Sequence, residues 1–173
     1  MMKYVLGMLL IVLLAGCSGG NASEPEEPFY GIRGTVVEED EQRVLVVSNE
    51  KLGREDMENP RYNAAWLSGI HRKVEVGQQV EVAFDGGVND SYPLQAQGKS
   101  VKQIQDEQPE GAALSREEAV RQALQQAENL ITPTVLEVEY LERSSEWRIL
   151  IYENASISEN SEVEVRVQEE ANG

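Results

Sequence analysis

The segment from residue 29 to residue 104 consists of short runs in which apolar and polar residues alternate. Alternation with a period of two places the apolar side chains on one face of an extended strand. Two runs carry the pattern over three alternate positions each: Ile32, Gly34 and Val36, and later Val80, Val82 and Phe84. A period of two does not match the 3.6-residue period of an α-helix, so this alternation predicts a β domain over 29–104.

Five strands are predicted in this domain, separated by turn-forming residues. They cover about 29–37, 44–47, 64–67, 80–84 and 94–104, with a charged turn at 38–42, a polar loop at 49–63 and a glycine-rich turn that begins at 85–87. Gly98 interrupts the last strand and predicts a β-bulge. A long first hairpin, a central interruption and a bent last strand favour a small barrel of the oligonucleotide/oligosaccharide-binding (OB) type.

The rest of the chain predicts a smaller unit of helix and sheet. Residues 105–113 are polar and read as a linker, and Ser115 stands three residues before Glu118, the spacing of a capping box. A helix is expected over 116–129, followed by strands at 135–141, 147–152 and 163–167. The predicted fold class is therefore α+β: a five-stranded OB-like barrel over 29–104, then a helix packed on a three-stranded antiparallel sheet within 114–173.

The first seventeen residues predict where the protein resides. Lys3 precedes an apolar run too short to span a membrane, and the run ends in Leu14-Ala15-Gly16-Cys17. This tetrad resembles the lipobox of bacterial lipoproteins, which implies a signal peptide over 1–16 and acylation of Cys17. The implied localisation is the extracytoplasmic face of the cell membrane, with residues 17–28 as a flexible tether. An ordinary secretory signal with an incidental cysteine is the alternative.

Charge excludes one class of partner. The formal net charge is −16, and residues 105–173 hold five Lys and Arg against sixteen Asp and Glu. Polyanion binding requires clustered basic side chains that replace condensed counterions, and the sequence has no such cluster. Nucleic acid is therefore not an expected partner, and the acidic excess is explained by solubility.

Two family resemblances add to this interpretation. The order and spacing of Gly31 with Gly34, Val44-Leu45-Val46, Ala65-Trp66-Leu67, Val76-Gly77 with Val80, and Ser91-Tyr92-Pro93 resemble those of YobA-like secreted lipoproteins of low-GC Gram-positive bacteria. That resemblance implies localisation and a compact β fold, but no activity. Residues 114–167 resemble half of a PepSY-type unit, which implies contact with other envelope proteins, as an inhibitor or a chaperone-like domain.

The sequence offers no recognisable catalytic constellation. His71 is the single histidine and is followed by Arg72 and Lys73, which would repel a metal cation. Ser91 lacks the glycine-flanked elbow of serine hydrolases. We therefore predict no enzyme activity, no cofactor and no metal site. An enzyme that uses acidic residues on wall glycans remains an alternative, because the sequence cannot place two carboxylates across a cleft.

The predicted function is a non-catalytic binding module that contacts an envelope protein, a peptide or a wall polymer through the open face or loops of the barrel. Candidate ligand contacts are Tyr92 and Trp66, whose rings could stack on a ligand or belong to the core, together with Asp85 and Asp90. The two aspartates flank a glycine-rich turn with Asn89, so a calcium-responsive envelope protein is a further alternative. These residues are also those of an ordinary tight turn.

Overall fold

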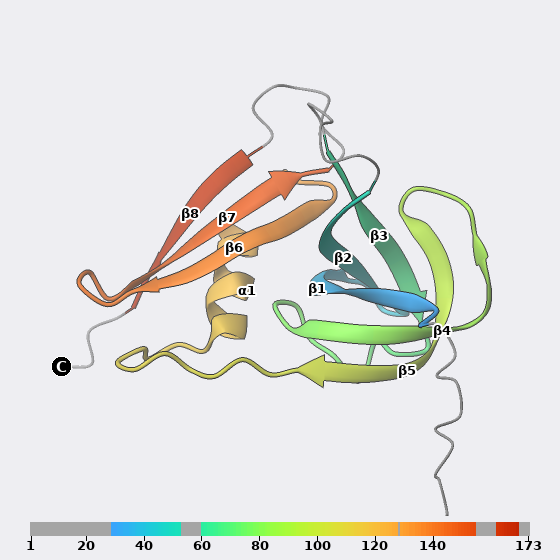
Figure 1. Ribbon diagram of the computed structural model, residues 1–173, viewed down its shortest axis with the longest axis horizontal. Coiled ribbons are helices and arrows are strands. Elements are labelled where there is room, and N and C mark those ends of the chain that lie inside the picture. The colour runs from blue at the N-terminus through green and yellow to red at the C-terminus, as the bar shows by residue number, and fades with distance from the viewer. Residues whose placement is uncertain (1–28, 53–59, 128, 155–161, 170–173) are drawn as a thin grey trace, which may run out of the picture.

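The computed structural model describes residues 29–52, 60–127, 129–154 and 162–169, and shows a closed barrel beside a helix and a three-stranded sheet (Figure 1). The predicted signal peptide, Cys17 and the tether lie outside the described residues. The barrel strands are β1 (Gly31–Glu39), β2 (Arg43–Leu52), β3 (Arg61–Ser68), β4 (Gln79–Asn89) and β5 (Leu94–Ile104).

The strands close in the order β1-β2-β3-β5-β4, and β1 pairs with β4. Only β3 and β5 run parallel among these pairs; the other neighbours are antiparallel. A five-stranded mixed barrel of this order confirms the predicted OB-like fold.

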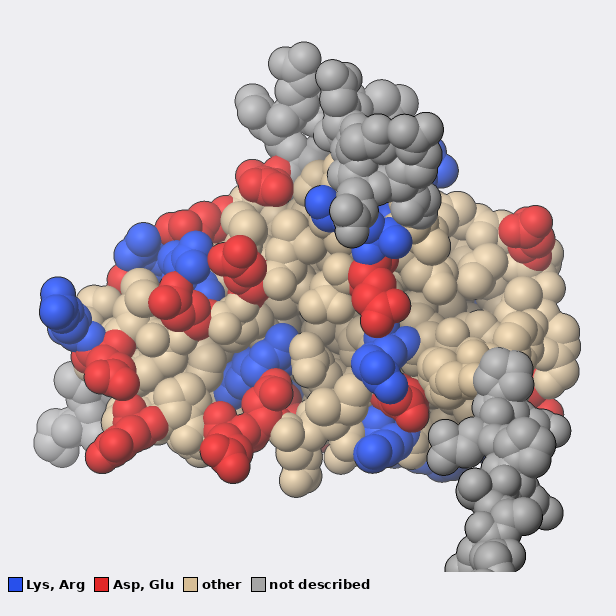
Figure 2. All heavy atoms as spheres, viewed as in Figure 1, with Lys and Arg blue, Asp and Glu red and all other residues tan. Residues whose placement is uncertain are grey.

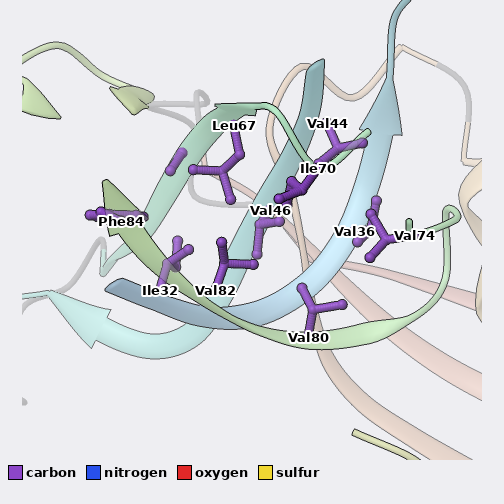
Figure 3. Packing of buried hydrophobic residues seen from close by; sticks show 11 residues of the cluster. Ile32, Val36, Val44, Val46, Leu67, Ile70, Val74, Val80, Val82 and Phe84 are labelled. Atoms are coloured by element: carbon purple, nitrogen blue, oxygen red, sulfur yellow. The ribbon is translucent and has the colours of Figure 1, made fainter. Parts of the chain in front are cut away.

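The barrel interior is filled by apolar residues, among them the alternating Ile32, Val36, Val80, Val82 and Phe84 that the sequence indicated. Figure 3 shows their side chains converging from the strands. The buried set is Ile32, Val36, Val44, Val46, Ala65, Leu67, Ile70, Val74, Val80, Val82 and Phe84. Ile70 and Val74 come from the connection between β3 and β4, so this connection closes the interior without a helix among its residues 69–78.

Three predicted boundaries in the barrel need correction. The polar stretch 49–63 was expected to be a loop, but β2 continues to Leu52 and β3 begins at Arg61, because these strands pair beyond a register shift. The turn expected at 85–87 is part of β4, which extends to Asn89 and pairs there with Gln95. The bulge predicted at Gly98 is confirmed by a register shift opposite it.

The C-terminal unit contains α1 (Arg116–Gln126) and a sheet of β6 (Pro133–Leu141), β7 (Glu146–Glu153) and β8 (Glu162–Gln168) in the order β6-β7-β8. The capping box is confirmed, because the Ser115 side chain accepts from the Glu118 amide and the Glu118 carboxylate accepts from the Ser115 amide. The helix ends three residues earlier than expected, and Asn129 adopts a left-handed conformation with φ 72°. One face of the sheet packs on Ala119, Val120 and Ala123 of α1.

Glu169, the residue after β8, closes this unit. Its carboxylate accepts hydrogen bonds from the amides of Ala113 and Leu114 at 3.0 Å, from Trp147 Nε1 at 3.0 Å and from the Tyr140 hydroxyl at 3.2 Å. Burial disfavours the charge, but these hydrogen bonds outweigh it and hold the pKa of Glu169 below its usual value. The linker, the helix start and the end of the sheet are thereby joined at one carboxylate.

Two β-bulges help to join the barrel and the sheet. The β1–β2 register skips Val37, and the β6–β7 register skips Leu136. Both side chains contribute to one apolar cluster between the two units, with Leu45, Val47, Tyr62, Ala64, Trp66, Leu124 and Tyr152. Leu45 and Val47 belong to the outer face of β2, while Val44 and Val46 face the barrel interior. The outer face of β2 and β3 is therefore covered in part by the C-terminal unit.

Asn154 adds hydrogen bonds to this interface. Its side-chain oxygen accepts from the Tyr62 amide at 2.9 Å, and its Nδ2 donates to the Tyr62 carbonyl at 3.3 Å. The same nitrogen donates to Thr134 Oγ1 at 3.0 Å. Asn154 is 5% exposed. A single buried amide thus satisfies both backbone groups of a barrel residue, as a neighbouring strand would.

Candidate functional site: a groove between the barrel and the helix

A groove of about 600 Å³ lies where the end of β1 meets α1. It is lined from three elements: the end of β1, the connection before β4, and the helix. The lining residues are Val37, Glu38, Glu39, Glu75, Val76, Arg121, Leu124 and Gln125. Barrel and helix both contribute walls, so the groove exists only when the two units are packed together.

The helix is held close to the barrel at Gly77. Gly77 has φ +96°, a conformation that L side chains rarely adopt, and a Cβ built there would lie 2.2 Å from the Glu117 carbonyl oxygen of α1. Arg121 fixes the same contact: its Nε donates to the Val76 carbonyl at 3.0 Å, and its guanidinium pairs with Glu75 at 2.9 Å. The distance between the walls of the groove is set by these contacts.

The groove combines an apolar surface with an acidic rim. Three apolar residues line the groove: Val37 is buried, and Val76 and Leu124 are half-buried. Glu38 and Glu39 are exposed at the end of β1. Arg121 is the only basic residue of the lining, and its guanidinium already donates to the Val76 carbonyl and the Glu75 carboxylate. A ligand with apolar groups and a positive charge fits this chemistry.

A second hollow, of about 460 Å³, lies over the outer face of β1, β4 and β5. Arg33, Glu81 and Lys102 stand opposite one another on these three strands and line the hollow. Figure 2 shows alternating basic and acidic groups in a row over the barrel. Hydrogen bonds from Arg33 lower the pKa of Glu81. Since Arg33 and Glu81 already pair with each other, the hollow offers less to a charged ligand than the groove does.

Tyr92, a predicted ligand contact, lies beside the start of β3. Its hydroxyl donates to the Tyr62 carbonyl at 3.1 Å, and the Arg61 guanidinium lies 5.6 Å from its ring centroid. The side chain is still 40% exposed, and burial raises the pKa of Tyr92 to about 12. Tyr92 therefore joins the β4–β5 connection to β3 with its hydroxyl and leaves part of its ring accessible.

Trp66 belongs to the cluster between the two units. It is half-buried on β3, and the Arg43 guanidinium lies 4.6 Å from its ring centroid. Arg43 is held in turn by Asp40, whose carboxylate accepts from Arg43 Nη2 at 2.8 Å. Trp66 belongs to β3 near its end, whereas Tyr92 contacts Arg61 and Tyr62 at its start. The structure therefore does not bring these two aromatic candidates together.

Asp85 and Asp90 are both exposed, Asp85 within β4 and Asp90 just after its end. Within the described residues, no hydrogen bond joins either to Tyr92 or Trp66, and no three His, Cys, Asp or Glu side chains are grouped so that they could hold a metal ion. His71 is half-buried in the connection after β3. No hydrogen bond within the described residues therefore links the four candidate ligand contacts, and their role in binding stays a prediction.

Comparison with known proteins gives one family match. Residues 33–105 match the family model described as "Protein of unknown function (DUF3221)". The barrel is a DUF3221 domain. The match covers β1 from Arg33 through the end of β5 and leaves out the C-terminal unit. Neither the curated proteins nor the solved structures contain a match to the chain.

Sequence reasoning did not identify the groove, although it noted several of its residues. Glu38 and Glu39 were expected in a charged turn, whereas they lie in β1, and Val76-Gly77 was noted through the family resemblance. A usable signal was the glycine between Val76 and the next strand, since a residue with positive φ often marks a close backbone contact. The partner of that contact, the carbonyl of Glu117, lies 40 positions away and could not be inferred from a local pattern.

Proposed function

We propose that the protein is a membrane-anchored, extracytoplasmic lipoprotein that acts as a non-catalytic binding module of the cell envelope. Three observations support the location: the Leu-Ala-Gly-Cys17 tetrad after an apolar run, the acidic segment that follows it, and the resemblance of residues 30–104 to YobA-like secreted lipoproteins. The resemblance of residues 114–167 to half of a PepSY-type unit supports a role in contacting other envelope proteins.

The groove between the barrel and α1 is the proposed contact site, and its chemistry carries the proposal. Apolar contact area in a concave site supplies affinity, while a few polar groups orient the ligand. Val37, Val76 and Leu124 supply apolar area, and Glu38 with Glu39 supplies negative charge. The ligand class that fits is an extended peptide segment of an envelope protein in which apolar and basic side chains alternate.

The anchor can be tested in cells. Growth with an alkyne-bearing fatty acid should label the wild-type protein, and Cys17→Ser should abolish both the label and recovery in the membrane fraction. A Ser18→Cys/Cys17→Ser variant that displaces the thiol by one position provides a matched control for the presence of a cysteine. Equal labelling of wild type and Cys17→Ser would refute the anchor.

Groove binding can be tested with residues 18–173, which retain every residue that the structure describes. The probe is a fluorescent peptide of alternating lysine and leucine, titrated at 0.15 M salt and followed by anisotropy. Glu38→Gln/Glu39→Gln should weaken binding by roughly tenfold, since two exposed ion pairs contribute about 0.7 kcal/mol each. Glu107→Gln/Glu142→Gln changes net charge equally at exposed positions outside the groove and is the matched control. Equal weakening by both double variants would mean that the peptide follows overall charge and not the groove.

A further inference from the structure

The C-terminal sheet has a free edge at β8. In the described part of the chain, β8 pairs with β7 on one side and with no strand on the other (Figure 1). An unpaired edge presents a row of backbone N–H and C=O groups that can pair with another strand. The opposite edge of the sheet, β6, instead lies against β1 and β2 of the barrel. The two edges therefore differ in what covers them.

Three common devices that block an edge strand are missing from β8, although its solvated face does carry the charged side chains of Glu162, Glu164 and Arg166. Natural edges are often interrupted by proline or a β-bulge, or are very short. The seven residues Glu162–Gln168 contain no proline, and the β7–β8 register is regular throughout. This edge is long and straight enough to accept a further strand.

The two faces of β8 have different chemistry. Val165 and Val167 are buried with α1 beneath the sheet, and Val163 on the same face is 38% exposed. Glu164 and Arg166 occupy the opposite, solvated face. A strand added at this edge must continue an apolar face on one side and a charged face on the other.

The sequence of β8 is complementary to itself in one register. In an antiparallel pair of two copies centred on Val165, Glu164 of each copy stands opposite Arg166 of the other. Val163 then stands opposite Val167, which covers its exposed side chain. Cross-strand pairs of opposite charge stabilise a sheet, and like charges directly opposite destabilise it.

Neighbouring registers are less favourable. A shift by two residues places either two copies of Glu164 or two copies of Arg166 directly opposite each other. A shift by one residue places every valine opposite a charged or polar side chain. Charge and alternation together select the register centred on Val165.

We propose that two copies of this chain associate through β8, antiparallel and centred on Val165, to form a continuous six-stranded sheet. A two-fold axis perpendicular to the sheet places both α1 helices on the same face. The interface is limited to one strand from each copy, so the dimer is weak, with a dissociation constant on the order of 100 μM. Because the chains carry a net charge of −16 each, association should strengthen as salt screens their repulsion.

Charge-swap variants of residues 18–173 test this register. Glu164→Arg places like charges opposite each other in a dimer, and so does Arg166→Glu, so each variant alone should be monomeric by sedimentation equilibrium up to about 500 μM, at which wild type dimerises. An equimolar mixture of the two variants restores both opposite-charge pairs and should dimerise with about the wild-type constant. Glu142→Arg and Arg143→Glu make the same charge changes in the exposed β6–β7 turn and should leave wild-type association unchanged.

Thermal unfolding of each variant separates loss of the dimer from loss of the fold. Within one copy Arg166 pairs with the buried carboxylate of Glu146 and with Glu164, and Glu164 also pairs with Arg148, so a drop in melting temperature is compatible with the proposal as long as the variant stays folded at the assay temperature. A wild-type chain that stays monomeric at 500 μM in 0.3 M salt would overturn it. If both single variants are folded and the equimolar mixture of Glu164→Arg with Arg166→Glu still fails to associate, the proposed register is equally overturned.

Discussion

Asn154 offers the sharpest test of how the barrel and the C-terminal unit are joined. Its side-chain amide makes hydrogen bonds to both backbone groups of Tyr62 and to Thr134 in a buried position. Asn154→Ala leaves the buried Tyr62 amide without its acceptor, whereas the Tyr62 carbonyl keeps the hydroxyl of Tyr92. An unsatisfied buried donor costs about 1–3 kcal/mol, and the lost side-chain volume adds a cavity.

We therefore expect Asn154→Ala to lower the free energy of unfolding by about 3 kcal/mol. With a urea dependence of about 2 kcal/mol per molar, the midpoint should fall by about 1.5 M. The two tryptophans allow this loss to be located. Trp66 lies in β3 of the barrel and Trp147 lies in β7 of the sheet, so the variants Trp66→Phe and Trp147→Phe each leave a fluorescence reporter in one unit.

In each single-tryptophan background, Asn154→Ala should shift the unfolding transition, because the amide stabilises the contact that both units share. Asn49→Ala removes an exposed amide of β2 and serves as the matched control, with an expected change within about 0.5 kcal/mol. If Asn154→Ala shifts the midpoint no more than Asn49→Ala does, the assignment of Asn154 as a link between the units is refuted.

Three further predictions concern single residues. Gly77→Ala should destabilise the protein by about 3 kcal/mol in urea titrations, because it combines a left-handed backbone with a Cβ against the Glu117 carbonyl; an unchanged midpoint would contradict the close packing of α1 on the barrel. Glu169→Gln should destabilise at pH 7, and the difference from wild type should shrink as pH falls below about 4.5: a carboxyl whose folded pKa is lowered adds stability above its unfolded pKa and loses it as pH falls through the folded pKa. Tyr92→Phe should remove one tyrosine that ionises near pH 12 from a spectrophotometric titration, while stability at pH 7 falls by less than about 1 kcal/mol, because Asn154 still serves the Tyr62 carbonyl.

Local sequence patterns were sufficient to predict the helix and the strands of this fold. Alternation identified β1, through Ile32 and Val36, and β4, through Val80 and Val82, whereas β2 was identified by its continuous apolar run from Val44 to Val47. Ser115 and Glu118 marked the start of α1 correctly, because a capping box depends on residues only three positions apart. The end of β4 was misjudged because Gly86 and Gly87 are typical of turns, yet pairing with β5 continues past them to Asn89.

The candidate site depended on contacts that no local pattern contains. Val37 and Leu136 contribute to the interface as bulge residues, and a bulge changes the alternation of faces for the residues that follow it. From the sequence, the ring of Tyr92 could belong either to the core or to a ligand site. In the structure its hydroxyl donates to the Tyr62 carbonyl, and part of the ring is exposed.

The sequence by itself determined a five-stranded barrel, a capped helix and a three-stranded sheet, because each follows from periodicity and spacing within a short segment. Only the tertiary structure decided that the outer face of β2 packs on the C-terminal sheet and that a groove opens beside Gly77. The physical reason is that both depend on backbone groups brought together from distant parts of the chain, such as Tyr62 with Asn154 and Gly77 with Glu117. Periodicity specifies which face of a strand is apolar, but the element that covers that face is selected by three-dimensional packing.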